Sequence, residues 1–243
     1  MHKHESAVFE PSQVSNEEWN RFDEHGFVVL SERVPTDILR GMCDRLDEIM
    51  FHGRSTDALM MQRESADGAY QNAGEQSTGW KGPTGDYRKI TGLDNDPAFR
   101  KFFDSSFVIE ARNRVYEGKG DPARFRAMIM NKSASGGTEL PFHQDRWDFV
   151  DCEPRMSVYV ALDPASIDSG CVEVLSGSHS VGLLSGHRRG VLSSEQLDEV
   201  RASFESVFLE LEAGQVVYLD CLTVHGSGLN RSGKPRRALS YLM

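Results

Sequence analysis

The chain has 243 residues and a formal net charge of −10, and 39% of its residues are hydrophobic. That length suits one large domain, with enough apolar residues to bury a core. The negative charge argues against nucleic acid as the main partner, because a phosphate backbone binds to an electropositive surface.

The first elements are predicted from helix capping and periodicity. Ser15 and Glu18 form a capping box before a short helix that ends near Gly26. The apolar run Phe27–Leu30 predicts a strand, and Pro35 opens a second helix. Apolar residues recur at helical spacing in this second helix, at Ile38, Leu39, Met42, Leu46, Ile49 and Met50.

Residues 53–88 differ from both flanks, because glycine, serine, threonine, aspartate and glutamine dominate them. A stretch of this length without periodicity is typically functional or disordered. We interpret it as a lid loop over a pocket, with surface disorder as the alternative. A helix from about Pro97 to Tyr116 is predicted to follow.

The pattern changes from helix to strand after about residue 120, where short apolar runs are broken by proline and glycine. Strands are predicted at 125–131, 156–162, 171–175, 207–211, 215–219 and 237–242, with one helix at 194–204. We therefore expect a single domain over 1–243, mainly β with flanking helices (α+β). In it a helical part, about 1–120, packs on an antiparallel sandwich or barrel, about 121–243.

The segment His143–Asp145 is the only His-x-Asp or His-x-Glu sequence in the chain. Because alternate residues of a strand point to the same face, both side chains can reach one ion. His225 would complete the two-histidine, one-carboxylate face that holds Fe(II) with positions open for O₂ and a co-substrate. A surface histidine beside an aspartate is the alternative. The apolar flanks of both motifs instead predict a buried site, where a charge needs a partner or a metal.

An arginine eleven residues beyond His225 points to an acidic co-substrate. A dicarboxylate that chelates iron through its keto-acid end leaves its distal carboxylate inside the protein, where arginine can meet it with two parallel hydrogen bonds. Arg236 stands at the entry to an apolar strand, and Ser227 is expected to share a face with His225 and to donate its hydroxyl. An exposed cation in a basic tail is the alternative for Arg236.

Six segments of the chain resemble the phytanoyl-CoA dioxygenase family of Fe(II)/2-oxoglutarate oxygenases. They are His25–Leu30, Tyr87–Ile90, His143–Asp145, Asp168–His179 (with Ser176 where the family has proline), His225–Ser232 and Pro235–Arg237. The resemblance implies a double-stranded β-helix (jelly-roll, cupin-like) core. It implies Fe(II) as the metal, with His143, Asp145 and His225 as its ligands and O₂ as the oxidant. It also implies 2-oxoglutarate contacts from Arg236, Ser227, Asn131 and Tyr159.

The activity that the resemblance implies is hydroxylation of an unactivated C–H, with succinate and CO₂ as co-products. Asp145 favours hydroxylation or a related oxidation, because relatives that halogenate have a small residue in its place. We expect a small polar substrate, an amino-acid derivative or a natural-product intermediate, because the chain is short for an acyl-CoA-processing enzyme. Candidate substrate contacts are Lys89, Arg88, Arg146, Trp147 and Trp80.

Two other classes of protein remain open on the sequence alone. A zinc-dependent hydrolase could use the same three ligands with a positioned general base, and a non-catalytic cupin-like binding protein could keep a metal for structure. The first 13 residues have no apolar h-region, and no run approaches the roughly 18 apolar residues of a membrane span. The four cysteines show no close pairing. We therefore expect a cytoplasmic protein with reduced thiols, a small-molecule substrate and no membrane partner.

Overall fold

The structure is a computed structural model that describes residues 14–54, 56–116, 126–146, 154–184 and 190–243. Its α-helices are α1 Asn16–His25, α2 Thr36–His52, α3 Pro97–Phe103, α4 Ser106–Tyr116 and α5 Ser194–Ser203. Its strands are β1 Phe27–Arg33, β2 Met60–Arg63, β3 Ser77–Thr78, β4 Tyr87–Thr91, β5 Arg126–Lys132, β6 Leu140–His143, β7 Met156–Ala161, β8 Val172–Leu175, β9 Ser206–Leu209, β10 Gln215–Asp220, β11 His225–Ser227 and β12 Arg236–Leu242. Short 3₁₀ turns lie at η1 Tyr70–Asn72, η2 Leu93–Asn95 and η3 Ser178–Val181.

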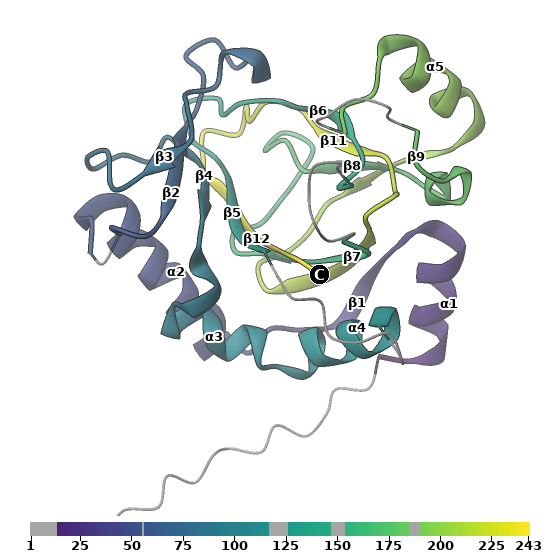
Figure 1. Ribbon diagram of the computed structural model, residues 1–243, viewed down its shortest axis with the longest axis horizontal. Coiled ribbons are helices and arrows are strands. Elements are labelled where there is room, and N and C mark those ends of the chain that lie inside the picture. The colour runs from purple at the N-terminus through teal and green to yellow at the C-terminus, as the bar shows by residue number, and fades with distance from the viewer. Residues whose placement is uncertain (1–13, 55, 117–125, 147–153, 185–189) are drawn as a thin grey trace, which may run out of the picture.

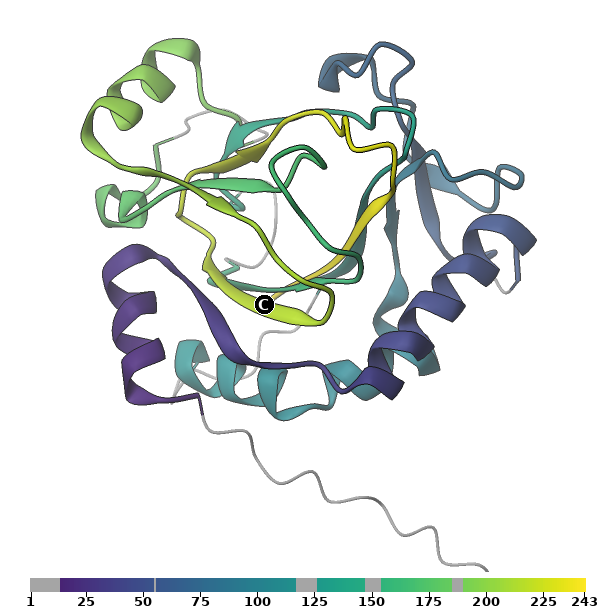
Figure 2. The same ribbon diagram turned by 180° about the vertical axis from the view of Figure 1, so that it is seen from behind.

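The strands form two antiparallel sheets. The larger has eight strands in the order β1-β10-β7-β12-β5-β4-β2-β3, and the smaller has four in the order β6-β11-β8-β9. Helices α2, α3 and α4 run along the outer side of the larger sheet, and α5 lies beside the smaller one (Figures 1 and 2). The protein is therefore mainly β, a jelly roll with flanking helices, and the predicted fold class is confirmed.

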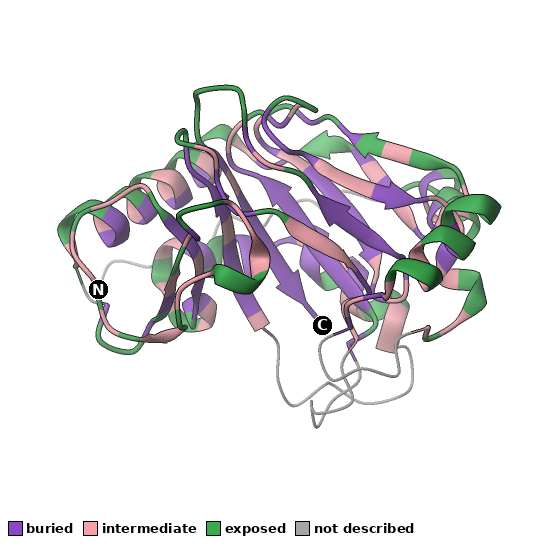
Figure 3. Ribbon diagram, turned by 90° about the horizontal axis from the view of Figure 1, so that it is seen from above, coloured by how far each residue is buried: buried purple, intermediate pink, exposed green. Residues whose placement is uncertain are grey.

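The central strands of the larger sheet are buried on both faces, which Figure 3 shows as continuous purple. On β7, Val158 and Val160 belong to the core beneath the helices, whereas Tyr159 and Ala161 belong to the core shared with the smaller sheet. This follows from the alternation of side chains along a strand. The strands are apolar without a polar face because helices cover one side and the second sheet covers the other. Polar residues on the inner face are therefore buried, and they mark a site.

The predicted capping box at the N-terminus is confirmed. Ser15 Oγ accepts a hydrogen bond from the backbone N–H of Glu18, and the Glu18 carboxylate accepts one from the backbone N–H of Ser15 at 2.8 Å. The same carboxylate accepts hydrogen bonds from the backbone N–H and the hydroxyl of Ser31, at 2.8 and 2.9 Å. Glu18 therefore joins α1 to β1, which pairs with β10 at the edge of the larger sheet.

Two of the predicted elements are wrong. Residues 53–88 are not one loop, because β2, η1, β3 and the start of β4 lie within them, and β2 and β4 extend the larger sheet. The apolar pair that anchors these strands, Met61 opposite Ile90, is fully buried but too short to give a period in the sequence. The helix predicted over 97–116 is divided into α3 and α4 at Asp104 and Ser105, where the backbone N–H of Ser105 turns back to the carbonyl of Phe102.

The strand predicted at Phe27–Leu30 is confirmed as β1, whereas β2, β3 and β4 show that the N-terminal half is less helical than its sequence indicates. In the part of the chain that the structure describes, no helix has the length and hydropathy needed to cross a membrane.

Candidate active site

The two predicted histidine ligands are cross-strand neighbours. His143 ends β6, and it pairs in register with His225, the first residue of β11. Residues directly opposite each other in an antiparallel pair present their side chains to the same face. The two imidazole rings accordingly lie with their centroids 4.3 Å apart, and both residues are buried.

Each histidine is oriented by a backbone carbonyl. Nδ1 of His143 donates to the carbonyl of Pro141 and Nδ1 of His225 to the carbonyl of Thr223, both at 2.9 Å. This arrangement fixes the ring and leaves Nε2 with a free lone pair, which is the form of histidine that binds a metal. Burial, and then the nearby His143, lowers the pKa of His225 to about 4, so His225 is neutral at pH 7.

Asp145 follows His143 by two residues and points to the same place. Its carboxylate oxygens lie 3.5 Å from Nε2 of His143 and 3.8 Å from Nε2 of His225. Burial opposes its ionisation, but the neighbouring His143 and His225 and the charge of Lys89 lower the pKa of Asp145 to about 2, so its carboxylate is ionised at pH 7. The ligand atoms of the three residues all lie within 4.8 Å of one another, so they could hold one metal ion.

Gln144, between the two ligands, has a structural role that the sequence analysis missed. Its side chain is fully buried and points away from the ligands, as alternation requires. Its amide nitrogen donates to the carbonyls of Gly182 and Leu222, at 2.9 and 2.6 Å, and its amide oxygen accepts from the backbone N–H of Leu184 at 2.8 Å. These bonds hold the segment that leaves β6 and thereby position Asp145.

Arg236 begins β12 and lies inside the protein, with only 3% of its surface exposed. One terminal nitrogen of Arg236 donates a hydrogen bond to the carbonyl of Gly170. The other donates to the hydroxyl oxygen of Tyr159 at 3.4 Å. Its Nε is buried without a hydrogen-bond partner. A buried guanidinium with a free donor, and with no ion pair to any described carboxylate, is suited to bind an anion.

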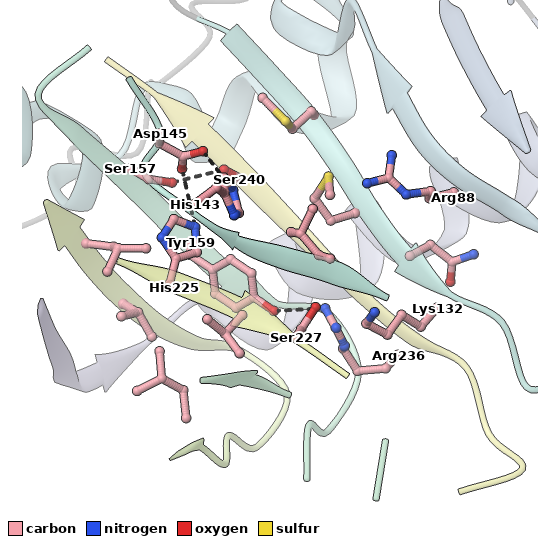
Figure 4. A pocket seen from close by; sticks show the side chains of 18 of the residues that line it. Arg88, Lys132, His143, Asp145, Ser157, Tyr159, His225, Ser227, Arg236 and Ser240 are labelled. Carbon is pink, nitrogen blue, oxygen red and sulfur yellow. Dashed lines mark hydrogen bonds and ion pairs between the residues drawn. The ribbon is translucent and has the colours of Figure 1, made fainter. Parts of the chain in front are cut away.

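One cavity connects the two ends of this arrangement. Figure 4 shows His143, Asp145 and His225 together at one end, and Arg236 at the other with Ser227 nearby. Asn131 also lines the cavity. Its amide nitrogen donates to the carbonyls of Gly85 and Tyr87, and its oxygen is buried without a partner. The remaining lining is largely apolar and keeps water from the centre: Met128, Met130, Leu140, Val172, Leu209, Val217 and Leu219.

Lys132 is a second buried basic residue in this cavity, and the sequence analysis missed it. It is the register partner of Arg236 across β5 and β12, and its amino group donates a hydrogen bond to the carbonyl of Thr138. The signal was present in the sequence, because Met128, Met130 and Lys132 alternate along β5 and so share the inner face. Burial, and then the charges of Arg236 and Arg88, lower the pKa of Lys132 to about 6.

We expect the Lys132→Met variant to be more stable than the parent protein, by a margin that grows as the pH falls. Between pH 10.5 and about 6, Lys132 is protonated in the unfolded chain but neutral in the fold, so the parent loses up to about 1.4 kcal/mol per pH unit as the pH falls through this window. Methionine does not titrate and removes this loss. Melting temperatures of both proteins from pH 9 to pH 6 measure the difference, and parallel curves would contradict the buried neutral lysine.

The carbonyl of Gly170 accepts the hydrogen bond from Arg236, and Gly170 has a φ of 68°, in the left-handed region. A Cβ at this position would lie 2.6 Å from the carbonyl oxygen of Gly228 and 2.8 Å from that of Leu229, so backbone would have to move. We expect Gly170→Ala to cost at least about 1–3 kcal/mol of stability and to weaken binding at Arg236. The matched control is Gly233→Ala, because Gly233 has a φ of 71° but open space around it. Equal losses of melting temperature in the two variants would contradict the close approach.

Two of the five predicted substrate contacts line a cavity beside the metal ligands. Arg88 and Lys89 line a second, outer cavity that shares His143 and Asp145 with the first, and Arg88 lines both. Residues Tyr70–Gln76 also border this outer cavity, with Asn72 excepted, so part of the segment 53–88 lies at its mouth. Closure of that segment as a lid stays a prediction.

Two of the predicted substrate contacts lie elsewhere, and a third is outside the described residues. Arg146 lines a separate surface hollow together with Asp23 and Asp220 and lines neither of the two cavities beside the metal ligands. Trp80 donates from its indole nitrogen to the carbonyl of Met50 at 3.2 Å and lies against the end of α2, outside both cavities. Trp147 falls in the segment that the structure does not describe.

A jelly roll that carries two histidines and a carboxylate at one end of a buried cavity has the site of non-haem iron oxygenases. The protein is an Fe(II)/2-oxoglutarate-dependent dioxygenase, which uses Fe(II), 2-oxoglutarate and O₂. It belongs to the phytanoyl-CoA dioxygenase (PhyH) family, whose family model matches residues 22–238.

Individual relatives are distant. The chain is 25% identical to a phytanoyl-CoA dioxygenase of Arabidopsis thaliana, over 90% of this chain and 84% of that protein. It is similar in fold to EctD from S. alaskensis, solved with 2-oxoglutarate and 5-hydroxyectoine, at 18% identity and a TM-score of 0.69 over 98% of this chain and 77% of that one. It is also similar to AviO1 from Streptomyces viridochromogenes Tue57, at 20% identity and a TM-score of 0.64 over 95% of both chains.

Proposed function

We propose that the protein hydroxylates an unactivated C–H bond of a small polar metabolite, an amino-acid derivative or a natural-product intermediate. Iron and 2-oxoglutarate, when bound, supply the oxidation: one oxygen atom of O₂ enters the C–H bond to give C–OH, and the other enters succinate as CO₂ is lost. Everything else in the reaction is binding, orientation and exclusion of water by the chain's own residues.

His143, Asp145 and His225 are the proposed iron ligands. The donor set of two neutral imidazoles and one carboxylate suits Fe(II) and leaves positions open for a chelating co-substrate and O₂. The backbone carbonyls of Pro141 and Thr223 hold the imidazoles in the required tautomer.

Arg236 and Ser227 are the proposed partners of the distal carboxylate of 2-oxoglutarate. Arg236 has an unused donor, and Ser227 lines the cavity between it and His225. Tyr159, whose hydroxyl accepts from Arg236, and Asn131, with its unpartnered oxygen, are proposed as further co-substrate contacts.

The observation that supports this proposal best is a buried cavity with a metal-ligand set at one end and a buried arginine at the other. A hydrolase would need a second acid or base beside the metal water. Among the described residues that line this cavity, Asp145 is the only carboxylate. A binding protein without activity would not need a donor of fixed charge at Arg236.

Two measurements test the proposal. Anaerobic addition of Fe(II) and 2-oxoglutarate should give the weak visible charge-transfer band of a chelated keto acid, and a zinc hydrolase or a metal-free binding module would stay colourless. A panel of amino acids and small organic acids should then include compounds that stimulate succinate release together with O₂ uptake. A colourless protein that releases no succinate under any condition would overturn the proposal.

A further inference from the structure

The orientation of the His225 ring depends on the turn that precedes it. The backbone of His225 pairs with His143 on β6 and with Val174 on β8. Its Nδ1, however, donates to the carbonyl of Thr223, a residue of the turn 221–224 between β10 and β11. Because a metal-binding imidazole is oriented by the bond that its second nitrogen makes, the groups that fix this carbonyl also fix the direction of Nε2.

The turn is attached to Gly26, the residue between α1 and β1, through one carbonyl. Thr223 is fully buried, and its hydroxyl donates to the carbonyl of Gly26 at 2.9 Å. The backbone N–H of Asp220 donates to the same carbonyl at 2.8 Å, and the backbone N–H of Thr223 donates to the carbonyl of Asp220 at 2.9 Å. The Gly26 carbonyl therefore joins both ends of the turn, and the Thr223 hydroxyl is the side-chain part of this contact.

Ser178 holds the same turn from a second segment. It opens η3, it is fully buried, and its Oγ accepts a hydrogen bond from the backbone N–H of Val224 at 2.9 Å. The carbonyl of Val224 accepts from the backbone N–H of Leu175, also at 2.9 Å. Val224 directly precedes His225, so both of its backbone groups are fixed by the segment that ends in Ser178. The proposed function leaves Ser178 without a role.

The end of α1 packs against the same segments. The last carbonyls of a helix have no partner within the helix, and here the carbonyl of Asp23 accepts from Nε2 of His179 at 3.1 Å. Gly26 has a φ of 76°, and a Cβ there would collide with the Thr223 hydroxyl and with the ring of His179. The end of α1, η3 and the turn before His225 therefore form one closely packed support.

The hydroxyls of Thr223 and Ser178 are outside the space where the reaction occurs. Neither residue lines the cavity that leads to Arg236 or the outer cavity, so they act through His225. We propose that Thr223 and Ser178 are positioning residues of the metal site, which fix the Thr223 carbonyl and, through it, Nε2 of His225. This inference rests on the proposed function, in which His225 is an iron ligand. A ligand of this kind has to be held within about 0.5 Å of its working geometry.

Binding of Co(II) to the metal-free full chain tests the proposal without any turnover. Co(II) takes the same nitrogen and oxygen ligands as Fe(II), and its visible absorption depends on their geometry. Thr223→Val keeps the shape of the side chain and removes the hydroxyl, while the Asp220 N–H still satisfies the Gly26 carbonyl. We expect this variant to bind Co(II) about 10-fold more weakly than the parent, with a shifted band, since loss of a partner outside the ligand set typically weakens metal binding by about 10- to 100-fold.

Two further variants identify the hydroxyls as the cause. Thr223→Ser keeps the hydroxyl and should restore the affinity and the band of the parent. Ser178→Ala leaves the Val224 N–H without its acceptor and should weaken Co(II) binding by a similar factor. The inference is overturned if either Thr223→Val or Ser178→Ala binds Co(II) with the affinity and the band of the parent, or if Thr223→Ser binds as weakly as Thr223→Val.

Thr56→Val is the matched control, because it removes another buried threonine hydroxyl. Thr56 donates to the carbonyl of Gly53 at 3.2 Å and lines neither cavity, so its variant should bind Co(II) like the parent. Melting temperatures of the metal-free proteins show how much stability each substitution costs. A merely structural hydroxyl would lower the melting temperature and leave the Co(II) affinity unchanged. An equal loss of Co(II) affinity in Thr56→Val would contradict a role specific to His225.

The failure of this inference is distinguishable from failure of the proposed function. The parent is first tested for the visible band with Fe(II) and 2-oxoglutarate, and the absence of that band contradicts the proposed function itself. If the parent gives the band, and the variants of Thr223 and Ser178 bind Co(II) as the parent does, only the positioning role is overturned.

Discussion

Asp145→Ala is expected to lower 2-oxoglutarate turnover by roughly 1,000-fold or more, because residues that act together as one catalytic unit fail when one is removed. Asp145 supplies the only carboxylate of the three-residue set, and its oxygens lie 3.5 and 3.8 Å from the two imidazoles. Alanine would leave two histidines and no anionic ligand. Succinate release and iron content, measured on the same preparation, separate lost binding of the metal from lost chemistry.

The control for this variant removes a carboxylate far from the cavity. Asp198→Ala changes an exposed residue of α5 and should keep the turnover and iron content of the parent. Full activity in Asp145→Ala would contradict the ligand assignment. Wild-type melting temperature in the metal-free variant would show that a loss of activity does not come from unfolding.

Arg236→Met is expected to raise the KM for 2-oxoglutarate by about 100-fold, with a smaller change in kcat at saturation. The estimate follows from the 2–5 kcal/mol that truncation of one partner of a buried charge pair typically costs. Arg236 lies at the end of the cavity opposite the metal ligands, so its loss should affect binding of the distal carboxylate more than the oxidation itself. Initial rates of succinate release against 2-oxoglutarate concentration give both constants.

Two comparisons make the Arg236 result specific. Arg231→Met removes an exposed arginine from the same basic segment and should leave the KM unchanged. Arg236→Lys keeps the charge but not the planar pair of donors, and it should recover part of the affinity. An unchanged KM in Arg236→Met would show that the distal carboxylate binds elsewhere.

Six of the eight described strands after residue 120 were predicted well because their signal is local, whereas β6 and β11 are too short to give one. The six predicted ranges correspond to β5, β7, β8, β9, β10 and β12 with shifts of one or two residues. Each is a short apolar run between turn residues, and this local pattern is enough to predict a buried strand. The capping box at Ser15 is local in the same sense, since its partner, Glu18, is three residues away.

The elements that the sequence misjudged depend on neighbours distant in the chain. Strands β2 and β4 are short and largely polar on the cavity side, so only their pairing with each other and with β5 shows that they are strands. Between β2 and β4 the register shifts, because Gln62 pairs with Lys89 but Arg63 pairs with Tyr87, and such a β-bulge cannot be predicted from the sequence alone. Trp80 was placed at the cavity by its position in the segment 53–88, but its partner is the backbone of α2.

The sequence by itself determined the chemistry that is available: two histidines, one aspartate and an arginine in apolar surroundings, since residue type and alternation are properties of a short stretch of chain. The tertiary structure decided how these groups meet. Only the pairing of β6 with β11 brings His143 opposite His225, and only the pairing of β5 with β12 sets Lys132 beside Arg236. Such pairings are set by packing between strands many residues apart, and for that reason the buried lysine beside Arg236 became visible only in the fold.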